Sequence, residues 1–280
     1  MKIGITSPAY NYWGDEGYKK LAAIGFSAID FNLADTTTPV YSMPEDEFTA
    51  YLMRHKALAE KAGIEISQVH GPWRWPPQDK TDEDRAERME KMKKSIKACA
   101  ILGCKYWVIH PIMPFTHQDT LTGDGKKTWK MNLDFFRKLL PCAKEHGVII
   151  CFENMPMPQL SLASPWEILN FVREIDDENF KICLDTGHVA VYKDLSLGDA
   201  VRELGSEIKV LHVHDNDGKV DRHMIPYFGV IDWADFGKAL KDIGFDGVLS
   251  LETSPSTKLP PNIFEEMCGV YYKIAKSIIE

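Results

Sequence analysis

The chain has 280 residues, of which 44% are hydrophobic and 26% are charged, and its formal net charge is −8. This length fits one large α/β barrel or two ordinary domains, and the hydrophobic fraction is enough for a sizeable core. Nucleic-acid affinity depends largely on Lys and Arg side chains that neutralise phosphates, so the acidic balance disfavours a general polyanion-binding protein. No window of about 18 apolar residues occurs, which argues against a membrane span.

The N-terminus and the cysteines both indicate a reducing compartment. Residues 1–6 have the composition of an immediate first strand rather than of a signal peptide, which favours a cytoplasmic location. The six cysteines are scattered without a CxxC pair, so we expect buried, reduced thiols rather than a disulfide framework. Cys151 and Cys183 lie inside apparent strands, where we expect them to pack in the core.

Strand and helix patterns alternate along the whole chain. In chain order, we expect a strand at 2–6, a helix at 15–24, a strand at 27–31, a helix at 44–62, a strand at 64–69, a helix at 82–102, a strand at 105–110, a helix at 129–146, a strand at 148–153, a helix at 165–175, a strand at 180–185, a helix at 197–204, a strand at 208–214, a helix at 233–243, a strand at 247–252 and a helix at 261–279. Several helices end at a Gly, the usual residue after a helix, as at Gly25, Gly63 and Gly147.

This alternation predicts an α/β fold, a single (β/α)₈ TIM barrel. An open, doubly wound sheet is the main alternative, although it rarely needs so many units. No linker or low-complexity tract interrupts the pattern, so we expect one domain over residues 1–280. The longer segments at 71–81, 111–128, 154–164 and 215–232 all follow strands, where the loops of barrel enzymes usually determine specificity.

Most of the predicted strands end in a His, Asp or Glu. These residues are His70, His110, Glu153, Asp185, His214 and Glu252, and His188 follows Asp185 by three positions. The carboxyl ends of all strands in a parallel barrel meet on one face, so we expect these side chains to converge.

Glu153, Asp185, His214 and Glu252 come from four consecutive strands and can surround one divalent cation. Three carboxylates and one imidazole suit Mn²⁺, Co²⁺, Mg²⁺ or Zn²⁺, with positions left for water and substrate. The plainer alternative is that each is a separate polar group at the barrel rim. His212 shares the strand face of His214, and we expect it to be a hydrogen-bonded neighbour rather than a ligand.

Aromatic and polar residues after the first strands are candidates for the pocket wall. Tyr10, Trp13 and Trp73 offer flat apolar faces for the C–H side of a sugar, and ordinary packing at the rim is the alternative. Asp30 and Asn32 end the second strand, where they can bind substrate hydroxyls or cap a helix.

Several short segments occur in barrel order over essentially the whole chain. They are His110-Pro111, Glu153-Asn154, Asp185-Thr186-Gly187-His188, His214-Asp215-Asn216-Asp217, and Asp221-Arg222-His223 followed by Ile231-Asp232-Trp233. In this order and spacing the chain resembles the xylose-isomerase-like superfamily of TIM barrels, which holds sugar isomerases, ketose 3-epimerases, inosose dehydratases and endonuclease-IV-type nucleases.

The resemblance to the epimerases implies that Glu153 and Glu252 bind the metal and also exchange the substrate proton, and that His188 hydrogen-bonds substrate oxygens. His70, His110, Trp13 and Trp73 are further candidates for substrate binding. The implied reaction is isomerisation or epimerisation of a sugar, keto-polyol or related hydroxy-carbonyl compound through a metal-stabilised enediolate, with one cation per chain. Residues 155–160 lack the further glutamate and the Arg-containing segment of ketose 3-epimerases, so the particular sugar stays open.

Three alternatives stay open beside this one. An inosose-type dehydratase uses the same first deprotonation. An endonuclease-IV-like phosphodiesterase acting on abasic DNA holds three zinc ions, for which His70, His110, His188, Asp221 and His223 would be additional ligands. A catalytically silent barrel that binds a ligand is the third. We favour a small-molecule sugar or polyol as the partner over nucleic acid. The apolar face of residues 261–279 is expected to pack on the barrel, with a homo-oligomer contact as the alternative.

Overall fold

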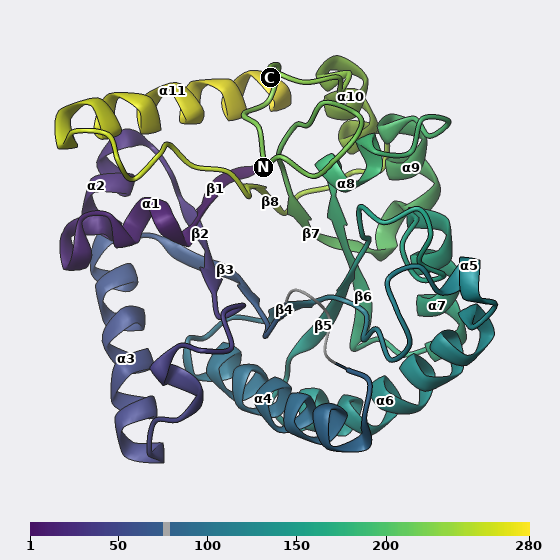
Figure 1. Ribbon diagram of the computed structural model, residues 1–280. Coiled ribbons are helices and arrows are strands. Elements are labelled where there is room, and N and C mark those ends of the chain that lie inside the picture. Colours follow the sequence, from purple (N-terminus) through teal and green to yellow (C-terminus); the bar gives the residue numbers. More distant parts are fainter. Residues whose placement is uncertain (75–78) are drawn as a thin grey trace.

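Parallel strands form the inner wall of the molecule and helices surround them, as Figure 1 shows. The structure is a computed structural model that describes residues 1–74 and 79–280. Over these residues the sheet has eight strands in the order β7-β6-β5-β4-β3-β2-β1-β8. The strands are β1 (Lys2–Thr6), β2 (Ala28–Asn32), β3 (Glu65–His70), β4 (Tyr106–Ile109), β5 (Ile149–Glu153), β6 (Phe180–Asp185), β7 (Ile208–His212) and β8 (Val248–Leu251).

The wall closes between the two end strands of this order. Val213, directly after β7, donates its N–H to the carbonyl of Ser250 at 2.8 Å, and its own carbonyl accepts from the N–H of Glu252 at 3.0 Å. The predicted TIM barrel is therefore confirmed, and the open doubly wound sheet is not adopted.

Each predicted helix is present on the outside of the barrel. These helices are α2 (Gly17–Ile24), α3 (Glu45–Ala62), α4 (Asp82–Ile101), α6 (Gly125–Glu145), α7 (Pro165–Ile175), α9 (Leu197–Leu204), α10 (Trp233–Asp242) and α11 (Pro261–Ile279). Three short helices were not predicted, namely α1 (Ser7–Asn11), α5 (Asp119–Thr122) and α8 (Thr186–Ala190). The same holds for the 3₁₀ turns at Gly14–Glu16, Pro39–Tyr41 and Gly205–Glu207. A single helical turn is too short to show a period of 3.6 residues.

Two boundaries differ from the prediction for physical reasons. Helix α6 begins at Gly125 rather than at residue 129, because its first turn is polar and carries no apolar period. Strand β7 ends at His212 rather than at residue 214, because the backbone of His214 pairs with a side chain instead of a strand. Its N–H donates to Thr186 Oγ1 at 3.0 Å, and the Thr186 hydroxyl donates to its carbonyl at 2.7 Å. In the loop expected at 71–81, positions 75–78 lie outside the described residues.

The barrel interior below the strand ends is filled by a small apolar layer. Its members are Val108, Ile149, Cys151, Cys183 and Val210. The predicted core positions of Cys151 and Cys183 are thus confirmed, and all six cysteines are free thiols. Helix α11 packs its Phe264 and Tyr271 side on the barrel.

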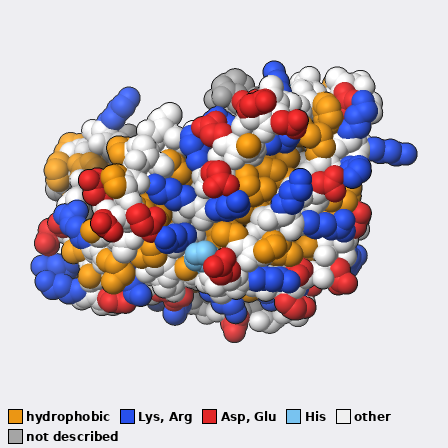
Figure 2. Space-filling view, turned by 90° about the horizontal axis from the view of Figure 1, so that it is seen from below, with side chains coloured by type: hydrophobic (Ala, Val, Ile, Leu, Met, Phe, Trp, Pro, Cys, Tyr) orange, Lys and Arg blue, Asp and Glu red, His pale blue; other side chains and the backbone are white. Residues whose placement is uncertain are grey.

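The outer surface is that of a chain with mixed charge. On the face seen in Figure 2, acidic and basic side chains are interspersed with apolar ones. In the part of the chain that the structure describes, no helix is long and apolar enough to cross a membrane.

Candidate active site

A cavity of about 520 Å³ opens at the carboxyl ends of the strands. Its described lining consists of Asn32, Ala34, His70, Trp73, His110, Glu153, Met155, Pro156, Met157, His188, Asp221, His223 and Glu252. Most of the predicted site residues therefore meet in one place. Asp185 and His214, which complete the predicted set of metal ligands, are fully buried and contact this lining.

Glu153, the last residue of β5, lies among four imidazoles, one of which is that of His188, with its Nδ1 3.8 Å from Oε1 of Glu153. Its Oε1 is 2.9 Å from Nδ1 of His212, and its Oε2 is 2.9 Å from Nε2 of His110 and 3.7 Å from Nε2 of His70. Burial alone would raise the pKa of Glu153, but the imidazoles of His212 and His110 outweigh burial and hold it well below its ordinary value. Glu153 is therefore a carboxylate at neutral pH.

Glu252, directly after β8, has its pKa displaced in the opposite direction from that of Glu153. Burial raises the pKa of the Glu252 carboxyl well above its ordinary value, and the neighbouring carboxylates of Glu153 and Asp185 raise it further, against the imidazole of His212. Opposite displacements of two carboxyl pKa values in one site suit a pair made of one base and one acid.

Asp185 organises a second group at the start of α8. Its Oδ1 accepts the N–H of His188 at 2.6 Å, and its Oδ2 lies 3.0 Å from Nε2 of His214. Asn154 fixes the backbone of Asp185 with two hydrogen bonds, at 2.8 and 3.0 Å. Burial would raise the pKa of Asp185, but the imidazoles of His188 and His214 lower it to about 2.

Asp221 and His223 enter from the loop that follows β7. Oδ2 of Asp221 lies 3.0 Å from Nε2 of His223 and 3.3 Å from Nε2 of His188. The ring of His223 stacks on that of His214 with centroids 4.2 Å apart. Burial would lower the pKa of His188, but Asp185 and Asp221 raise it to about 10, and Asp221 together with Glu252 raises the pKa of His223 to about 10. This loop therefore extends the cluster beyond the strand ends.

The structure differs from the prediction in which imidazole lies closest to the three carboxylates. The carboxylates of Glu153, Asp185 and Glu252 lie within 4.8 Å of one another together with an imidazole, but that imidazole belongs to His212. His214 forms two other groups, one with Asp185 and His188 and one with Asp221 and His223.

The described residues fit a divalent cation. Oε2 of Glu252 is buried without a hydrogen-bond partner, and Oε2 of Glu153 is buried with Nε2 of His110 at 2.9 Å. The carboxylates of Glu153, Asp185 and Glu252 lie close together at this depth, which is costly unless a proton or a cation offsets their charge.

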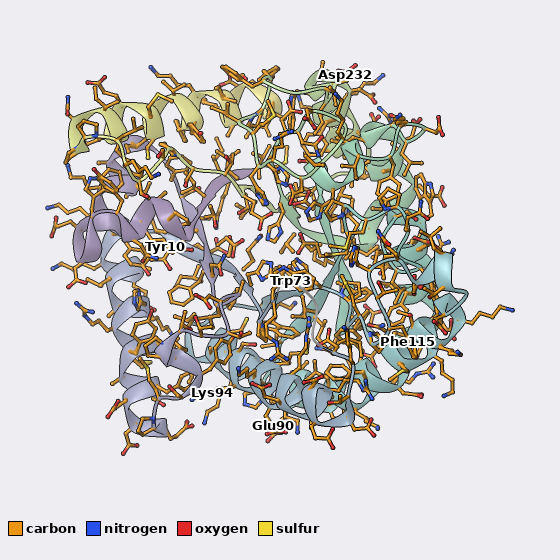
Figure 3. All side chains as sticks on the ribbon, viewed as in Figure 1. Tyr10, Trp73, Glu90, Lys94, Phe115 and Asp232 are labelled. Carbon is orange, nitrogen blue, oxygen red and sulfur yellow. The ribbon has the colours of Figure 1, made fainter. Side chains whose placement is uncertain are left out.

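The aromatic candidates separate in the structure. Trp73 lines the cavity, with its ring edge-on to His110 at 4.4 Å between centroids, and Figure 3 shows it near the barrel axis. Trp13 instead packs edge-on against Phe264 of α11. Tyr10 is a buried residue of α1, stacked on Tyr18 at 5.0 Å and away from the axis in Figure 3.

Asp30 and Asn32 also take different roles. Asn32 lines the cavity, and its Oδ1 accepts the N–H of Ala34 at 2.7 Å. Asp30 is buried and is neither in the cavity lining nor at a helix start; its Oδ2 is 3.0 Å from Nε2 of His212.

Two functional neighbours were not assigned a role from the sequence. Asn154 pins the end of β6 from the end of β5, and Asp215 anchors the loop that carries Asp221 and His223. Asn154 directly follows Glu153, and Asp215 directly follows His214. This position next to a predicted ligand is the signal that the sequence offers for a role of either residue.

Comparisons with known proteins agree with this geometry. A family model described as a xylose isomerase-like TIM barrel matches residues 18–273. The D-psicose 3-epimerase of Ruminiclostridium cellulolyticum is 29% identical over 266 residues, covering 90% of this chain and 83% of that protein. The D-psicose 3-epimerase of Agrobacterium fabrum is 30% identical over 265 residues, covering 90% and 84%.

A probable endonuclease 4 of Mycoplasmopsis agalactiae is 25% identical, over 79% of each chain. Among solved structures, the D-psicose 3-epimerase from Clostridium cellulolyticum H10 with D-tagatose superposes with a TM-score of 0.78, at 21% identity and over 100% of both chains. At that identity the likeness shows the fold.

Proposed function

The chain belongs to the xylose isomerase-like TIM-barrel family, and we propose that it is a metal-dependent isomerase or epimerase of a small, uncharged sugar or polyol that carries a carbonyl group. The observation that carries the proposal is the pair of glutamates in one cavity. Glu153 and Glu252 both line the cavity as buried carboxyl groups, and their pKa values are displaced in opposite directions. The relatives named D-psicose 3-epimerase support the same class of reaction.

Glu153, Asp185 and Glu252 would hold the cation together with the imidazole of His214. Nδ1 of His214 donates to the carbonyl of Asp215 at 3.2 Å, which leaves Nε2 facing Asp185 as the ligand atom. When bound, a divalent cation supplies a Lewis acid that polarises the carbonyl of a hydroxy-carbonyl substrate.

The protein groups then divide the proton transfers. Glu153 acts as the base that removes the proton from the carbon beside the carbonyl, and Glu252 acts as the acid that returns a proton. His188 and His223 line the same cavity and carry N–H groups that can hydrogen-bond substrate oxygens. A dehydratase acting on an inosose begins with the same deprotonation and remains a close variant of this proposal.

The cavity lining favours an unphosphorylated substrate. None of the described lining residues is a Lys or Arg, the side chains that usually bind phosphate groups. Trp73, Met155, Pro156 and Met157 form an apolar wall, which suits the C–H face of a sugar ring.

Proton exchange tests the proposal directly. Ketohexoses and inososes are incubated in D₂O with the protein and Co²⁺ or Mn²⁺, and deuterium incorporation beside the carbonyl is followed by NMR. The wild type and Glu265→Gln, a surface variant whose carboxylate pairs with Lys20, should exchange at equal rates. Glu153→Gln and Glu252→Gln should lose exchange by about 10²–10⁴-fold. Undiminished exchange in Glu252→Gln would refute the acid/base assignment.

A trinuclear phosphodiesterase is the second candidate, because the structure brings the additional ligand types together. His188, Asp221 and His223 form one linked group beside Asp185 and His214, and His70 and His110 flank Glu153. Elemental analysis of purified protein separates the candidates. About one metal ion per chain supports the sugar isomerase or epimerase. About three zinc ions per chain, with metal-dependent incision of abasic duplex DNA, would support the phosphodiesterase.

A further inference from the structure

We infer that Asp30 and His212 form a positioning dyad inside the barrel, which holds the Glu153 carboxylate in the orientation needed for its work. The inference rests on the role proposed for Glu153. It adds two residues that touch neither the cavity nor, in that proposal, the cation.

The dyad is defined by hydrogen bonds that cross the barrel interior. Nε2 of His212, on β7, lies 3.0 Å from Oδ2 of Asp30, on β2, and Nδ1 of the same ring lies 2.9 Å from Oε1 of Glu153, on β5. The His212 ring therefore links a carboxyl group of β2 to one of β5, with one ring nitrogen facing each.

Asp30 and His212 are buried, so each needs a hydrogen-bond partner within the protein. His212 is 0% exposed and Asp30 is 1% exposed, so neither can exchange its hydrogen bonds with bulk water. Gln68 supports Asp30 from β3, where its amide donates to Oδ2 of Asp30 at 3.2 Å and to the carbonyl of Leu211 at 3.3 Å. A carboxyl group at this depth costs free energy unless it is paired in this way.

The dyad determines which oxygen of Glu153 is available. Because Oε1 is held by His212, Oε2 is left on the side of the cavity, where Nε2 of His110 lies 2.9 Å away. The same Nδ1 lies 3.3 Å from Oε2 of Glu252, so one imidazole edge stands between the two glutamates. Ring stacking fixes its plane, since the His212 and His70 rings are 5.5 Å apart and nearly parallel, at 4°.

The dyad is therefore a second layer behind the site, and loss of such a layer weakens metal binding or activity by about 10–100-fold in metal sites generally. Asp30→Asn keeps the shape of the side chain but removes its charge and turns one of its two oxygens into an NH₂ donor. His212→Asn retains a donor near the position of Nδ1, toward Glu153, while removing the bond to Asp30.

The first test measures the affinity of the purified full chain for Co²⁺ by calorimetry, in the wild type, Asp30→Asn, His212→Asn and the double variant. Asp119→Asn is the matched control, because Asp119 is also buried but bonds to Ser161 in the loop around α5. We expect a loss of about 10–100-fold for Asp30→Asn, no loss for Asp119→Asn, and no further loss when Asp30→Asn is added to His212→Asn. A wild-type affinity in Asp30→Asn, or losses that multiply in the double variant, would overturn the dyad.

A second measurement requires neither a bound metal nor a stable variant at position 30. In wild-type protein labelled with ¹⁵N-histidine, the Nε2–H group of His212 should give an exchange-protected, downfield proton signal, assigned by its loss in His212→Asn. Absence of a protected Nε2–H signal would refute the bond to Asp30. If the wild type binds no Co²⁺, the proposed metal site fails while this signal still decides the dyad.

Discussion

Among residues that are not proposed ligands, Asp215 is the one whose substitution we expect to lower the free energy of unfolding most. Its carboxylate is fully buried directly after His214. It accepts hydrogen bonds from the Trp233 indole at 2.9 Å and from the backbone N–H groups of Tyr227 at 3.1 Å, Gly229 at 3.1 Å, Val230 at 3.0 Å, Ile231 at 3.2 Å and Asn216 at 2.9 Å.

Asp215→Asn turns one of the two oxygens into an NH₂ group, so about half of these donors would face another donor. Hydrogen bonds to a charged group contribute about 1.5–3 kcal/mol each, and a buried donor left without a partner costs about 1–3 kcal/mol. Water can satisfy part of the loop after relaxation, because Tyr227, Phe228 and Val230 are exposed. We therefore expect the free energy of unfolding to fall by about 3–5 kcal/mol rather than by the full sum.

Urea unfolding followed by circular dichroism and tryptophan fluorescence measures this loss. Asp217→Asn is the control in the same loop, since its partly exposed carboxylate pairs with Arg222 at the surface and should contribute little to the free energy of unfolding. The Asp215 variant should also bind Co²⁺ more weakly, because the anchored loop carries Asp221 and His223. A loss of stability below about 1 kcal/mol in Asp215→Asn would refute the anchoring argument.

Three further substitutions test separate parts of the structure. Gly187→Ala would place a Cβ 2.0 Å from Cε1 of the His214 ring, so it should displace that ring. We expect weaker Co²⁺ binding in calorimetry and a fall of about 1–3 kcal/mol in the free energy of unfolding. An unchanged Co²⁺ affinity would count against His214 as a ligand. Trp73→Ala removes an aromatic wall of the cavity and should raise KM about tenfold with little change in kcat. Steady-state kinetics on the sugar that shows deuterium exchange would measure both constants. An unchanged KM would place the substrate elsewhere. Burial, aided by the charge of Arg54, lowers the pKa of His55 in the folded protein. The stabilisation that neutral His55 gives is therefore complete above the unfolded-state pKa of about 6.5, and it is lost as the pH falls through the lower pKa of the folded state. The urea midpoint should accordingly drop less between pH 7 and pH 5 in His55→Gln than in the wild type, and equal drops would contradict this assignment.

The sequence was sufficient for the barrel because its signals are repeated in every unit. A helix that ends at Gly63 or Gly147 and a β-rich run that follows are local features, and their regular alternation leaves few topologies to consider. The short helices α1, α5 and α8 carry no such signal, and α8 exists because Asp185 caps the N–H of His188. Helices of this kind depend on tertiary contacts that a one-dimensional pattern does not contain.

Convergence of the site was predictable for a similar reason. Parallel strands deliver their last residues to one face, so Glu153 and Glu252 had to approach one another once the barrel was assumed. The sequence does not show which of their oxygens would be held and which left free, because that depends on His212, whose partner Asp30 lies more than a hundred residues away on β2. For the same reason Trp13 and Trp73, equivalent as sequence features, separate into a helix contact and a cavity wall.

The two histidines of β7 show where the alternation rule stops. Residues two apart share a face only while the strand continues; the pairing with β6 ends at His212 and the pairing with β8 ends at Val213. His212 therefore points into the barrel, where its two nitrogens face the carboxyl groups of Asp30 and Glu153. His214 lies beyond the ladder with its backbone tied to Thr186, and its ring occupies the space that Gly187 leaves open and stacks on His223. Two histidines on one strand end thus take different roles, His212 as a positioning group and His214 as a candidate ligand. At His214 the Thr186 hydroxyl takes the place of the hydrogen bond that a neighbouring strand would make.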